Sequence, residues 1–431
     1  MHSTQTPIPQ WQSDLIQQIL NGLEAYYCLP EKFQQNKRNI EEALVEQFRI
    51  LNQQNPDAFF EPPNSKETWE IYLHSMNSTL EKFDPHLHLQ YDAKFLQNAV
   101  DSEVKVERDG DSAKFNFGEG PPPHELERMN TFREKLNYGF TTTPEEKIEV
   151  PDNIGYLKIS CLLDPRDGAN LDDGKYQLGP NAVKRLNEIM QSFRNKKGII
   201  IDLRDAPEGG SPEMVQYIIS FFIEEKNKLI NTIENRLTKS TTPYYTLPTP
   251  NELFIQAPVI ILTDKTTFSA REEIAYDFQQ LNKQLQAEGK QAGDRFQIFG
   301  EEEIIDNKKF YTVGGAHPEM SFPLLNPETG EINRHIYMRI PYARTVNPYS
   351  GTNWEEHGDG GIRPDKVVSK ENGLSLAIEN LQSQISKKEI IEDTEQKATT
   401  AMRRGSLLAD RSSDQQSKKP DNLDSNKKFT Q

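Results

Sequence analysis

The sequence is poor in cysteine, in long apolar runs and in net positive charge. Its 431 residues include two cysteines, Cys28 and Cys161, which lie far apart and form no CxxC pair. This spacing indicates neither a disulfide framework nor a thiolate metal site, and we expect no cofactor. No segment approaches the roughly 18 consecutive apolar residues that a membrane span requires. We therefore expect a chain without a transmembrane segment.

The charge balance argues against nucleic acid as a partner. The formal net charge is −16, and no stripe of lysine and arginine alternates with aromatic residues. Such a chain repels phosphate backbones. The first residues, MHSTQTPIPQWQSDLIQQIL, lack the basic region followed by an apolar region that is typical of a secretory signal. We therefore expect a cytoplasmic protein, with non-standard export left open.

The pattern of apolar residues divides the chain into four regions. Apolar residues recur at helical spacing in residues 1–83, which predicts an N-terminal helical domain. Residues 84–150 contain short strand candidates separated by turn signals, and we interpret them as a β-containing connector. Residues 151–387 are predicted to form an α/β core. Residues 388–431 lack the apolar content needed to bury a core, so we predict a disordered tail.

The α/β prediction depends on three apolar runs that alternate with helical patterns. These runs are NIGYLKIS at 153–160, GIIIDLR at 198–204 and APVIILT at 257–263. Continuous apolar strands separated by helices are typical of a sheet that is covered on both faces. The fold class is therefore predicted to be α/β.

Ser269 follows the third apolar run, after a short turn and at the start of an amphipathic helix. A helix N-terminus directs backbone N–H groups and the positive end of the helix dipole toward an oxyanion formed beside it. Ser269 is therefore a candidate nucleophile. Ser269 and Glu272 also match a capping box, in which the serine has only a structural role. The pattern by itself leaves both interpretations open.

A glycine pair, Gly209 and Gly210, follows the second apolar run and precedes a helix that begins at Ser211 and Pro212. Glycine allows the backbone to approach a bound group closely, so one N–H group of the pair is a candidate oxyanion donor. The alternative is an ordinary turn between strand and helix.

A nucleophilic serine needs a base, and histidine is the usual one. His86 leads an alternating segment, FDPHLHLQYD, while His317 and His357 lie in glycine-rich segments. A single histidine is more often structural than catalytic. Glu355, in a loop rich in glycine, asparagine and proline, is a candidate for the acid that orients the base. Its alternative role is that of a solvated surface acid.

Together these segments resemble a known family. NIGYLKI, IIIDLRDAPEGGSPEMV, PVIILTDKTTFSAREEIAYD, VGGAHP and TNWE followed by GIRPD resemble, in this order, the tail-specific or carboxyl-terminal processing proteases. Within that superfamily they resemble the branch that contains the modules of interphotoreceptor retinoid-binding protein. The resemblance covers about residues 84–370. It implies a crotonase-like, ClpP-like core of the ββα type.

The resemblance also implies a role for each candidate residue. Ser269 matches the family's nucleophile, His86 its general base and Glu355 its acid. The backbone N–H of Ala270 and that of the pair Gly209–Gly210 match the oxyanion donors. The implied activity is that of a serine-type peptidase that acts on peptides or unfolded proteins. The lysine base of better-known members has no counterpart in the segment QAGDRFQIFG, where it is expected.

The sequence departs from the family pattern at two places near the serine. Arg271 stands where a second small residue is usual, and its side chain is predicted either to occlude the site or to bind a substrate carboxylate. The glycine motif reads DAPEGG from Asp205 rather than N-x-G-G. These departures favour an alternative function, that of an inactive homologue that binds a hydrophobic ligand or a peptide.

Overall fold

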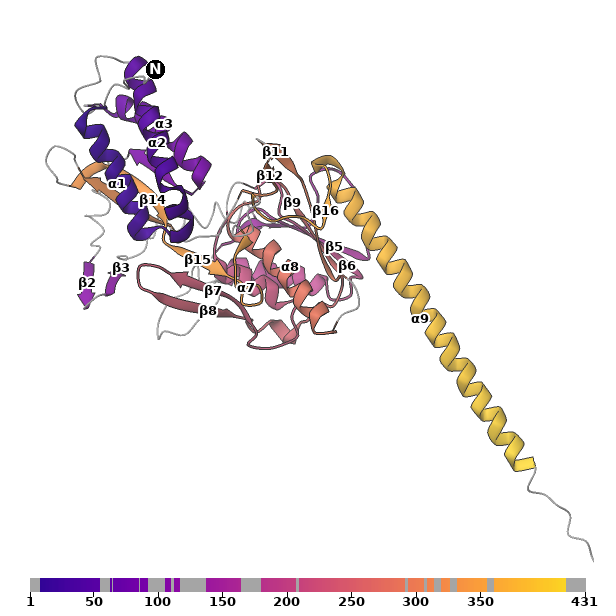
Figure 1. The fold of residues 1–431 in the computed structure, drawn as a ribbon. Coiled ribbons are helices and arrows are strands. Elements are labelled where there is room, and N and C mark those ends of the chain that lie inside the picture. Colours follow the sequence, from indigo (N-terminus) through magenta and orange to yellow (C-terminus); the bar gives the residue numbers. More distant parts are fainter. Residues whose placement is uncertain are drawn as a thin grey trace, which may run out of the picture. The chain divides into compact units, whose positions relative to one another are not determined.

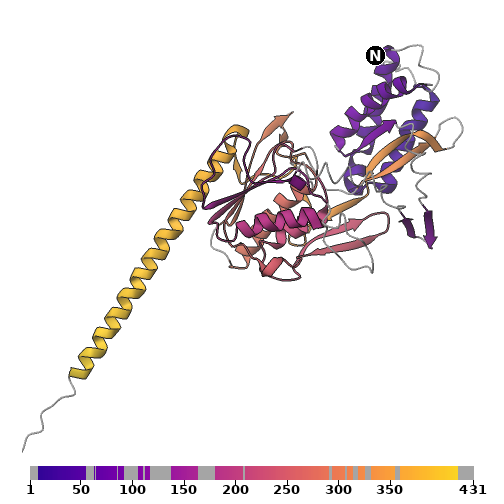
Figure 2. The same cartoon turned by 180° about the vertical axis from the view of Figure 1, so that it is seen from behind.

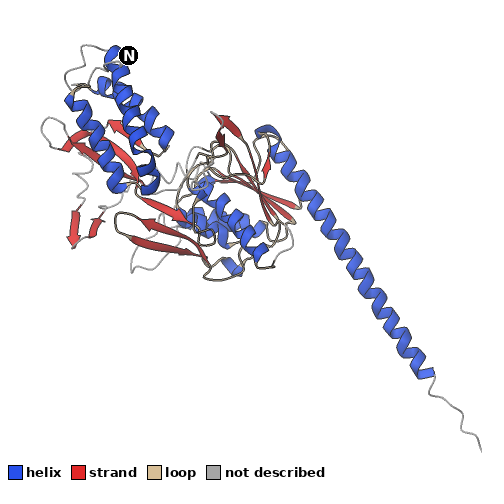
Figure 3. Cartoon of the chain, viewed as in Figure 1, coloured by secondary structure: helices blue, strands red, loops and turns tan. Residues whose placement is uncertain are grey.

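The computed structural model has a mixed α/β architecture (Figure 3). It describes residues 8–54, 63, 65–84, 86–91, 105–109, 112–116, 137–163, 180–206, 209–290, 294–305, 308–313, 319–325, 332–354 and 360–415. The chain separates into two compact units, residues 1–378 and residues 379–431. The first unit contains the candidate site residues.

A six-stranded sheet forms the centre of the α/β region. Its strand order is β16 (Lys366–Val367), β10 (Phe296–Gly300), β9 (Val259–Thr263), β6 (Gly198–Asp202), β5 (Ile154–Ile159) and β4 (Phe140–Thr141). All neighbouring strands are parallel except β4, which is antiparallel to β5. In the pairing of β6 with β9, Asp202 lies opposite Leu262. The loops that follow these two strands therefore begin at the same edge of the sheet.

The central strands are buried because helices cover the sheet. Alternate side chains of a strand point to opposite faces, and Leu157, Ile201 and Ile261 share one apolar cluster with residues of three helices. These helices are α6 (Pro180–Ser192), α7 (Pro212–Ser220) and α8 (Ala270–Ala287). Ser211 caps α7 by accepting a hydrogen bond from the Glu213 backbone N–H at 3.2 Å. The predicted α/β fold class is confirmed.

The N-terminal helices are α1 (Gln10–Tyr26), α2 (Pro30–Gln54) and α3 (Lys66–Phe83). Their apolar stripes pack on a second sheet with the order β1 (His88–Tyr91), β14 (Ile332–Pro341), β13 (Glu319–Leu325). Figures 1 and 2 show this arrangement from both sides. The helices were predicted from their spacing, but a core that is completed by strands more than 200 residues later leaves no local pattern in the sequence.

Strand β14 leads directly into β15 (Ala343–Val346), which pairs with β7 (Leu229–Asn235), and β7 pairs with β8 (Ser240–Tyr245). The remaining elements are short: β2 (Lys105–Asp109), β3 (Ser112–Asn116), β11 (Glu303–Ile305), β12 (Lys308–Phe310), η2 (Asn137–Gly139) and η4 (Pro250–Glu252). Strands β13 and β14 therefore belong to the N-terminal core, whereas β15, which follows β14 directly, belongs to the sheet of β15, β7 and β8.

Helix α9 (Lys370–Gln415) extends into the tail, residues 388–431, for which the sequence predicts disorder. The segment is rich in good helix formers, and Lys388 pairs with Glu392 at 3.9 Å and Asp393 with Lys397 at 2.6 Å, each one turn apart. Low apolar content argues against a buried core, but it does not prevent an exposed helix. Residues 416–431 of this prediction lie outside the described residues. No described helix is long and apolar enough to cross a membrane.

Replacing Met338 by alanine tests whether the N-terminal helices depend on strand β14. Met338 is fully buried in their apolar cluster, so Met338→Ala should lower the free energy of unfolding by about 2–5 kcal/mol. Urea denaturation monitored by circular dichroism gives this value. Ile304→Ala, at a position that is 64% exposed, is the control and should change stability by less than about 0.5 kcal/mol. Equal effects of the two substitutions would contradict the shared core.

Candidate active site

Ser269 lies at the N-cap of α8 with an unusual backbone conformation. Its φ is 56° and its ψ is −128°, a backbone conformation that residues other than glycine rarely adopt. The carboxylate of Glu272 accepts a hydrogen bond from the Ser269 backbone N–H at 3.0 Å. Glu272 is fully buried and also accepts a hydrogen bond from the Thr312 hydroxyl. The backbone half of the capping box thus holds Ser269 in place, and capping does not exclude a nucleophilic role for its side chain.

Gly209 lies directly against Ser269. A methyl group on Gly209 would lie 2.4 Å from Ser269 Cβ, 2.7 Å from its Oγ and 3.3 Å from the Ala270 backbone nitrogen. Only glycine fits at this distance. The carbonyl oxygen of Gly209 accepts a hydrogen bond from the Leu162 N–H at 3.1 Å, which fixes the glycine backbone next to the serine.

Gly210 is also held in a conformation that favours glycine. Its φ is 137°, and a methyl group there would lie 2.1 Å from the Leu162 carbonyl oxygen. The Ser211 N–H donates to that oxygen at 2.8 Å, so Leu162 bridges both sides of the glycine pair. The two glycines and the serine come from the loops after β6 and β9, which the parallel pairing of these strands brings together.

The described structure brings His86 to the segment that carries Ser269. The His86 imidazole stacks on the Phe268 ring with centroids 5.2 Å apart and an interplanar angle of 24°. The His86 side chain is buried, and its Nδ1 lies 3.0 Å from Asp84 Oδ1. The histidine lies almost two hundred residues before Ser269 in the sequence, but in the fold it contacts Phe268, the residue directly before the serine.

Asp84 is a functional candidate that the sequence analysis missed. It accepts hydrogen bonds from the His86 backbone N–H at 2.8 Å and from the Tyr27 hydroxyl at 2.6 Å. With Nδ1 donating to this carboxylate, Nε2 is left as the imidazole's proton acceptor. The available signal was the spacing Asp-Pro-His, which places the carboxylate two residues before the imidazole.

Glu355 lies outside the described residues, as do His317 and His357, so its role as the acid stays a prediction. The residue before it packs on α8. Trp354 is buried and packs on Tyr276 of α8, with ring centroids 5.3 Å apart.

The prediction that Arg271 occludes the site or binds substrate is replaced by a structural role. The side chain is fully buried. Its Nη1 donates to the Leu203 carbonyl at 2.6 Å, and its Nη2 donates to the carbonyls of Ala206 and, at 3.2 Å, Thr266. The guanidinium points into the protein because these three backbone oxygens need donors there. It is not available to a substrate carboxylate.

A second polar cluster lies further along α8. Glu273 and Asp277, one turn apart, are both buried, and the Asn231 side-chain amide donates to them at 2.8 and 2.6 Å. Asn347 donates to the other oxygen of Asp277 at 3.1 Å. Burial raises the pKa of Glu273 to about 8 and raises that of Asp277 as well. The sequence analysis missed this cluster because acids on an amphipathic helix look like a solvated face.

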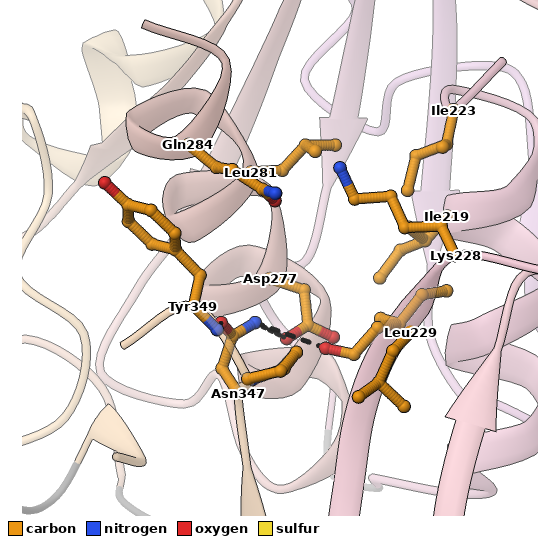
Figure 4. Close-up of a pocket in the computed structure, with 11 residues that line it drawn as sticks. Ile219, Ile223, Lys228, Leu229, Asp277, Leu281, Gln284, Asn347 and Tyr349 are labelled. Carbon is orange, nitrogen blue, oxygen red and sulfur yellow. Dashed lines mark hydrogen bonds between the residues drawn. The ribbon is translucent and has the colours of Figure 1, made fainter. Parts of the chain in front are cut away.

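Asp277 also lines a pocket (Figure 4). Lys228, which precedes β7, forms part of its wall together with Leu229 of β7, Leu281 of α8 and Tyr349. Ser269, His86 and Gly209 do not line it, so this pocket is separate from the serine site.

Residues 153–293 match the model of peptidase family S41. This part of the chain is therefore similar to the S41 peptidases. The resemblance to tail-specific proteases is confirmed, and the coarse function is that of a serine peptidase. The matched range contains Ser269 and the glycine pair, whereas His86 and Glu355 lie outside it. The closer resemblance to the retinoid-binding branch stays a prediction.

Solved structures show a weaker likeness over most of the chain. A lipoprotein from Streptococcus agalactiae is 12% identical, with 89% of this chain and 99% of that chain covered and a TM-score of 0.40. The photosystem II D1 C-terminal processing protease is 12% identical, with coverages of 83% and 93% and a TM-score of 0.37. Mature CPAF complexed with lactacystin is 12% identical, with coverages of 87% and 98% and a TM-score of 0.45. The similarity to the S41 peptidases rests on the match of residues 153–293 to the family model.

Replacing Glu273 by glutamine tests the buried carboxyl pair. Because the folded-state pKa of Glu273 is about 8, above its ordinary value of 4.5, the folded chain binds the proton more tightly than the unfolded chain. Its contribution to stability is complete below pH of about 4.5 and is lost as the pH rises through about 8. Glu273→Gln should therefore flatten the fall in stability over this range, measured by urea unfolding at several pH values.

The control is Glu252→Gln, at a fully exposed position whose pKa is lowered by a hydrogen bond from Lys226. This variant should follow the wild type between pH of about 5 and 8. A Glu273→Gln profile that runs parallel to the wild type would show that Glu273 is ionised in the folded protein.

Proposed function

We propose that this chain hydrolyses peptide bonds by acyl transfer to Ser269, with His86 as general base and Asp84 orienting the imidazole. One observation carries the proposal. His86, fixed through Nδ1 by Asp84, stacks on Phe268, the residue before a serine that is strained at a helix N-terminus and pressed against Gly209.

The reaction follows from the roles of these atoms. His86 Nε2 takes the proton of Ser269 Oγ while that oxygen bonds to the carbonyl carbon of the substrate. The tetrahedral intermediate breaks its C–N bond, and the proton passes from His86 to the leaving amine. Water, deprotonated by His86, then attacks the ester and releases a carboxylic acid, and the proton returns to Ser269. Every proton removed is returned within one cycle.

The oxyanion donors are proposed to be the backbone N–H of Ala270 and one N–H of the pair Gly209–Gly210. Ala270 is the first residue of α8, so its N–H is not used by the hydrogen bonds within the helix. The helix dipole adds positive potential at the same place. The close packing of Gly209 on Ser269 brings the second donor segment within reach. Such donors are typically worth about 10²- to 10³-fold in turnover each.

We retain Glu355 as a proposed second acid. Trp354, its neighbour, is anchored on α8, the helix that begins beside Ser269. Asp84 already makes the contact with His86 Nδ1. The role that the resemblance implies for Glu355, that of the acid that orients the base, stays a prediction.

The alternative function is that of an inactive homologue that binds a hydrophobic ligand or a peptide. One reason for it was the expectation that the Arg271 side chain occludes the site. Arg271 is buried and bonded to backbone carbonyls, so its guanidinium does not fill the space in front of Ser269.

Covalent labelling tests the nucleophile. A fluorophosphonate-rhodamine probe should label the wild-type chain, because Ser269 Oγ attacks phosphorus and displaces fluoride. Ser269→Ala should abolish labelling. Ser192→Ala, on α6, is the control and should label like the wild type, since its hydroxyl only donates to the Ile189 carbonyl. A chain that stays unlabelled but binds a hydrophobic ligand saturably would support the alternative function.

Substitution of Asp84 tests the orienting acid. Asp84→Asn should lower the labelling rate by about 10²- to 10⁴-fold, because an amide does not hold the imidazole in the tautomer that leaves Nε2 basic. Tyr27→Phe is the matched control: it removes the hydrogen bond that the Tyr27 hydroxyl donates to Asp84 and leaves the contact with the His86 imidazole. Labelling rates that fall equally in both variants would show that Asp84 contributes only to the stability of the fold.

A further inference from the structure

Arg271 joins two loops that meet at the serine. Leu203 and Ala206, whose carbonyl oxygens accept its hydrogen bonds, belong to the loop that runs from β6 to Gly209. Thr266, whose carbonyl also accepts, belongs to the turn that runs from β9 to Ser269. One side chain thus ties together the two segments that carry the proposed oxyanion donors.

The position of this cation needs an explanation, because it is electrostatically unfavourable. Arg271 lies in the first turn of α8, where the helix dipole repels positive charge. Burial lowers the pKa of its guanidinium, and the nearby carboxylates of Asp264 and Glu272 oppose this effect. A buried charge is retained only when its hydrogen bonds are satisfied. The three carbonyl bonds satisfy it, and a neutral apolar residue would leave those oxygens without these donors.

The Asp264 carboxylate also connects the two loops. Its Oδ2 accepts a hydrogen bond from the Asp205 N–H at 3.1 Å, and its Oδ1 accepts from the Thr266 N–H at 2.9 Å. The Thr267 hydroxyl donates to the Leu203 carbonyl at 3.2 Å. Each of these bonds links or orders the same two loops. The buried side chains of Asp264 and Arg271 therefore form a polar brace between them.

We propose that Arg271 is a positioning residue that sets the distance between the glycine-pair N–H and the Ala270 N–H. This inference rests on the proposed function of Ser269. The proposal links the two departures from the family pattern. The glycine motif reads DAPEGG rather than N-x-G-G, and Arg271, two residues after the serine, supplies hydrogen bonds to the carbonyls of Leu203 and Ala206, which precede the glycine pair. Arg271 does not touch the reacting atoms, so its effect is on the geometry of the donors.

The shape of the guanidinium distinguishes this role from a role of its charge. Arginine presents five donors in a rigid plane, whereas the lysine ammonium is a compact charge on a flexible stem. Lysine at position 271 keeps the positive charge but cannot hold three carbonyls in the same arrangement. If charge alone mattered, Arg271→Lys would behave like the wild type.

The chain offers a matched control in Arg295. This residue also uses its guanidinium to bind backbone carbonyls, those of Phe222 at 3.1 Å and Ile255, and burial lowers its pKa to about 10. Its partners lie after α7 and before β9, away from Ser269 and the glycine pair. Arg295→Met therefore removes a similar number of structural bonds elsewhere in the fold.

The experiment measures labelling by fluorophosphonate-rhodamine at several probe concentrations, which separates the limiting rate kinact from the half-saturating concentration KI. The full-length wild type is compared with Arg271→Met, Arg271→Lys, Arg295→Met and Ser269→Ala, and urea unfolding of each variant is recorded. Attack on phosphorus places a phosphoryl oxygen at the oxyanion donors, so kinact reports their geometry.

We expect kinact to fall about 10- to 100-fold in Arg271→Met and Arg271→Lys, with KI within about threefold, because small displacements at a reacting centre cost up to about 10²-fold. Arg295→Met should keep the wild-type kinact even where it unfolds at lower urea. If Arg271→Met does not fold, Arg271→Lys decides the question by the same two constants.

The outcomes separate the two proposals. If Ser269→Ala abolishes labelling while both Arg271 variants keep kinact within about threefold of Arg295→Met, the positioning role is overturned and the nucleophile stands. If Arg271→Lys keeps the wild-type kinact while Arg271→Met loses it, the charge acts instead of the hydrogen bonds, and the proposal is again overturned. Labelling that persists in Ser269→Ala overturns the proposed function, and this inference with it.

Discussion

The parallel pairing of β6 with β9 is the constraint on which the serine site depends. Because Asp202 lies opposite Leu262, the chain leaves both strands at the same edge of the sheet. The loop to Gly209 and the turn to Ser269 are thereby brought together, and the contact between these two residues tolerates no side chain on the glycine. Arg271 and the Thr267 hydroxyl donate hydrogen bonds between the loops, and the Asp264 carboxylate accepts them from both loops. The strained backbone of Ser269 is kept by this surrounding structure and by the Glu272 carboxylate.

The second half of the site comes from a different core. His86 follows α3. Asp84, which contacts the histidine, and Tyr27, which donates a hydrogen bond to Asp84, lie at the ends of N-terminal helices. Those helices are stabilised by β13 and β14, which return from late in the chain. The imidazole therefore reaches Phe268 through contacts between distant parts of the sequence. A histidine that is oriented by a buried carboxylate is the arrangement found in Ser-His-Asp triads.

Helix α8 is unusual in burying charged side chains along its first two turns. Arg271, Glu272, Glu273 and Asp277 are all nearly inaccessible to solvent. Each has hydrogen-bond partners from another element, since buried charges and acids are tolerated only when such partners exist. The helix thus begins at the proposed nucleophile, Ser269, and carries two polar clusters, one that contacts the loop before the glycine pair and one that lies beside the pocket at Asp277.

The sequence by itself determined the α/β class, the central strands and the helices that follow them, because continuous apolar runs and helical spacing are local patterns. It also indicated Ser269 and the glycine pair, since strand ends, glycines and a helix start are visible in a few residues. The tertiary structure alone decided that Arg271 points inward, that Asp84 contacts His86 and that Glu273 and Asp277 are buried. The helix that continues from residue 388 to Gln415 depends on helix propensity, a local property that apolar content does not measure. Only the tertiary structure decided that strands near residue 335 complete the N-terminal core. Like the positions of these side chains, this depends on which distant groups surround each residue, and no local spacing in the sequence records it.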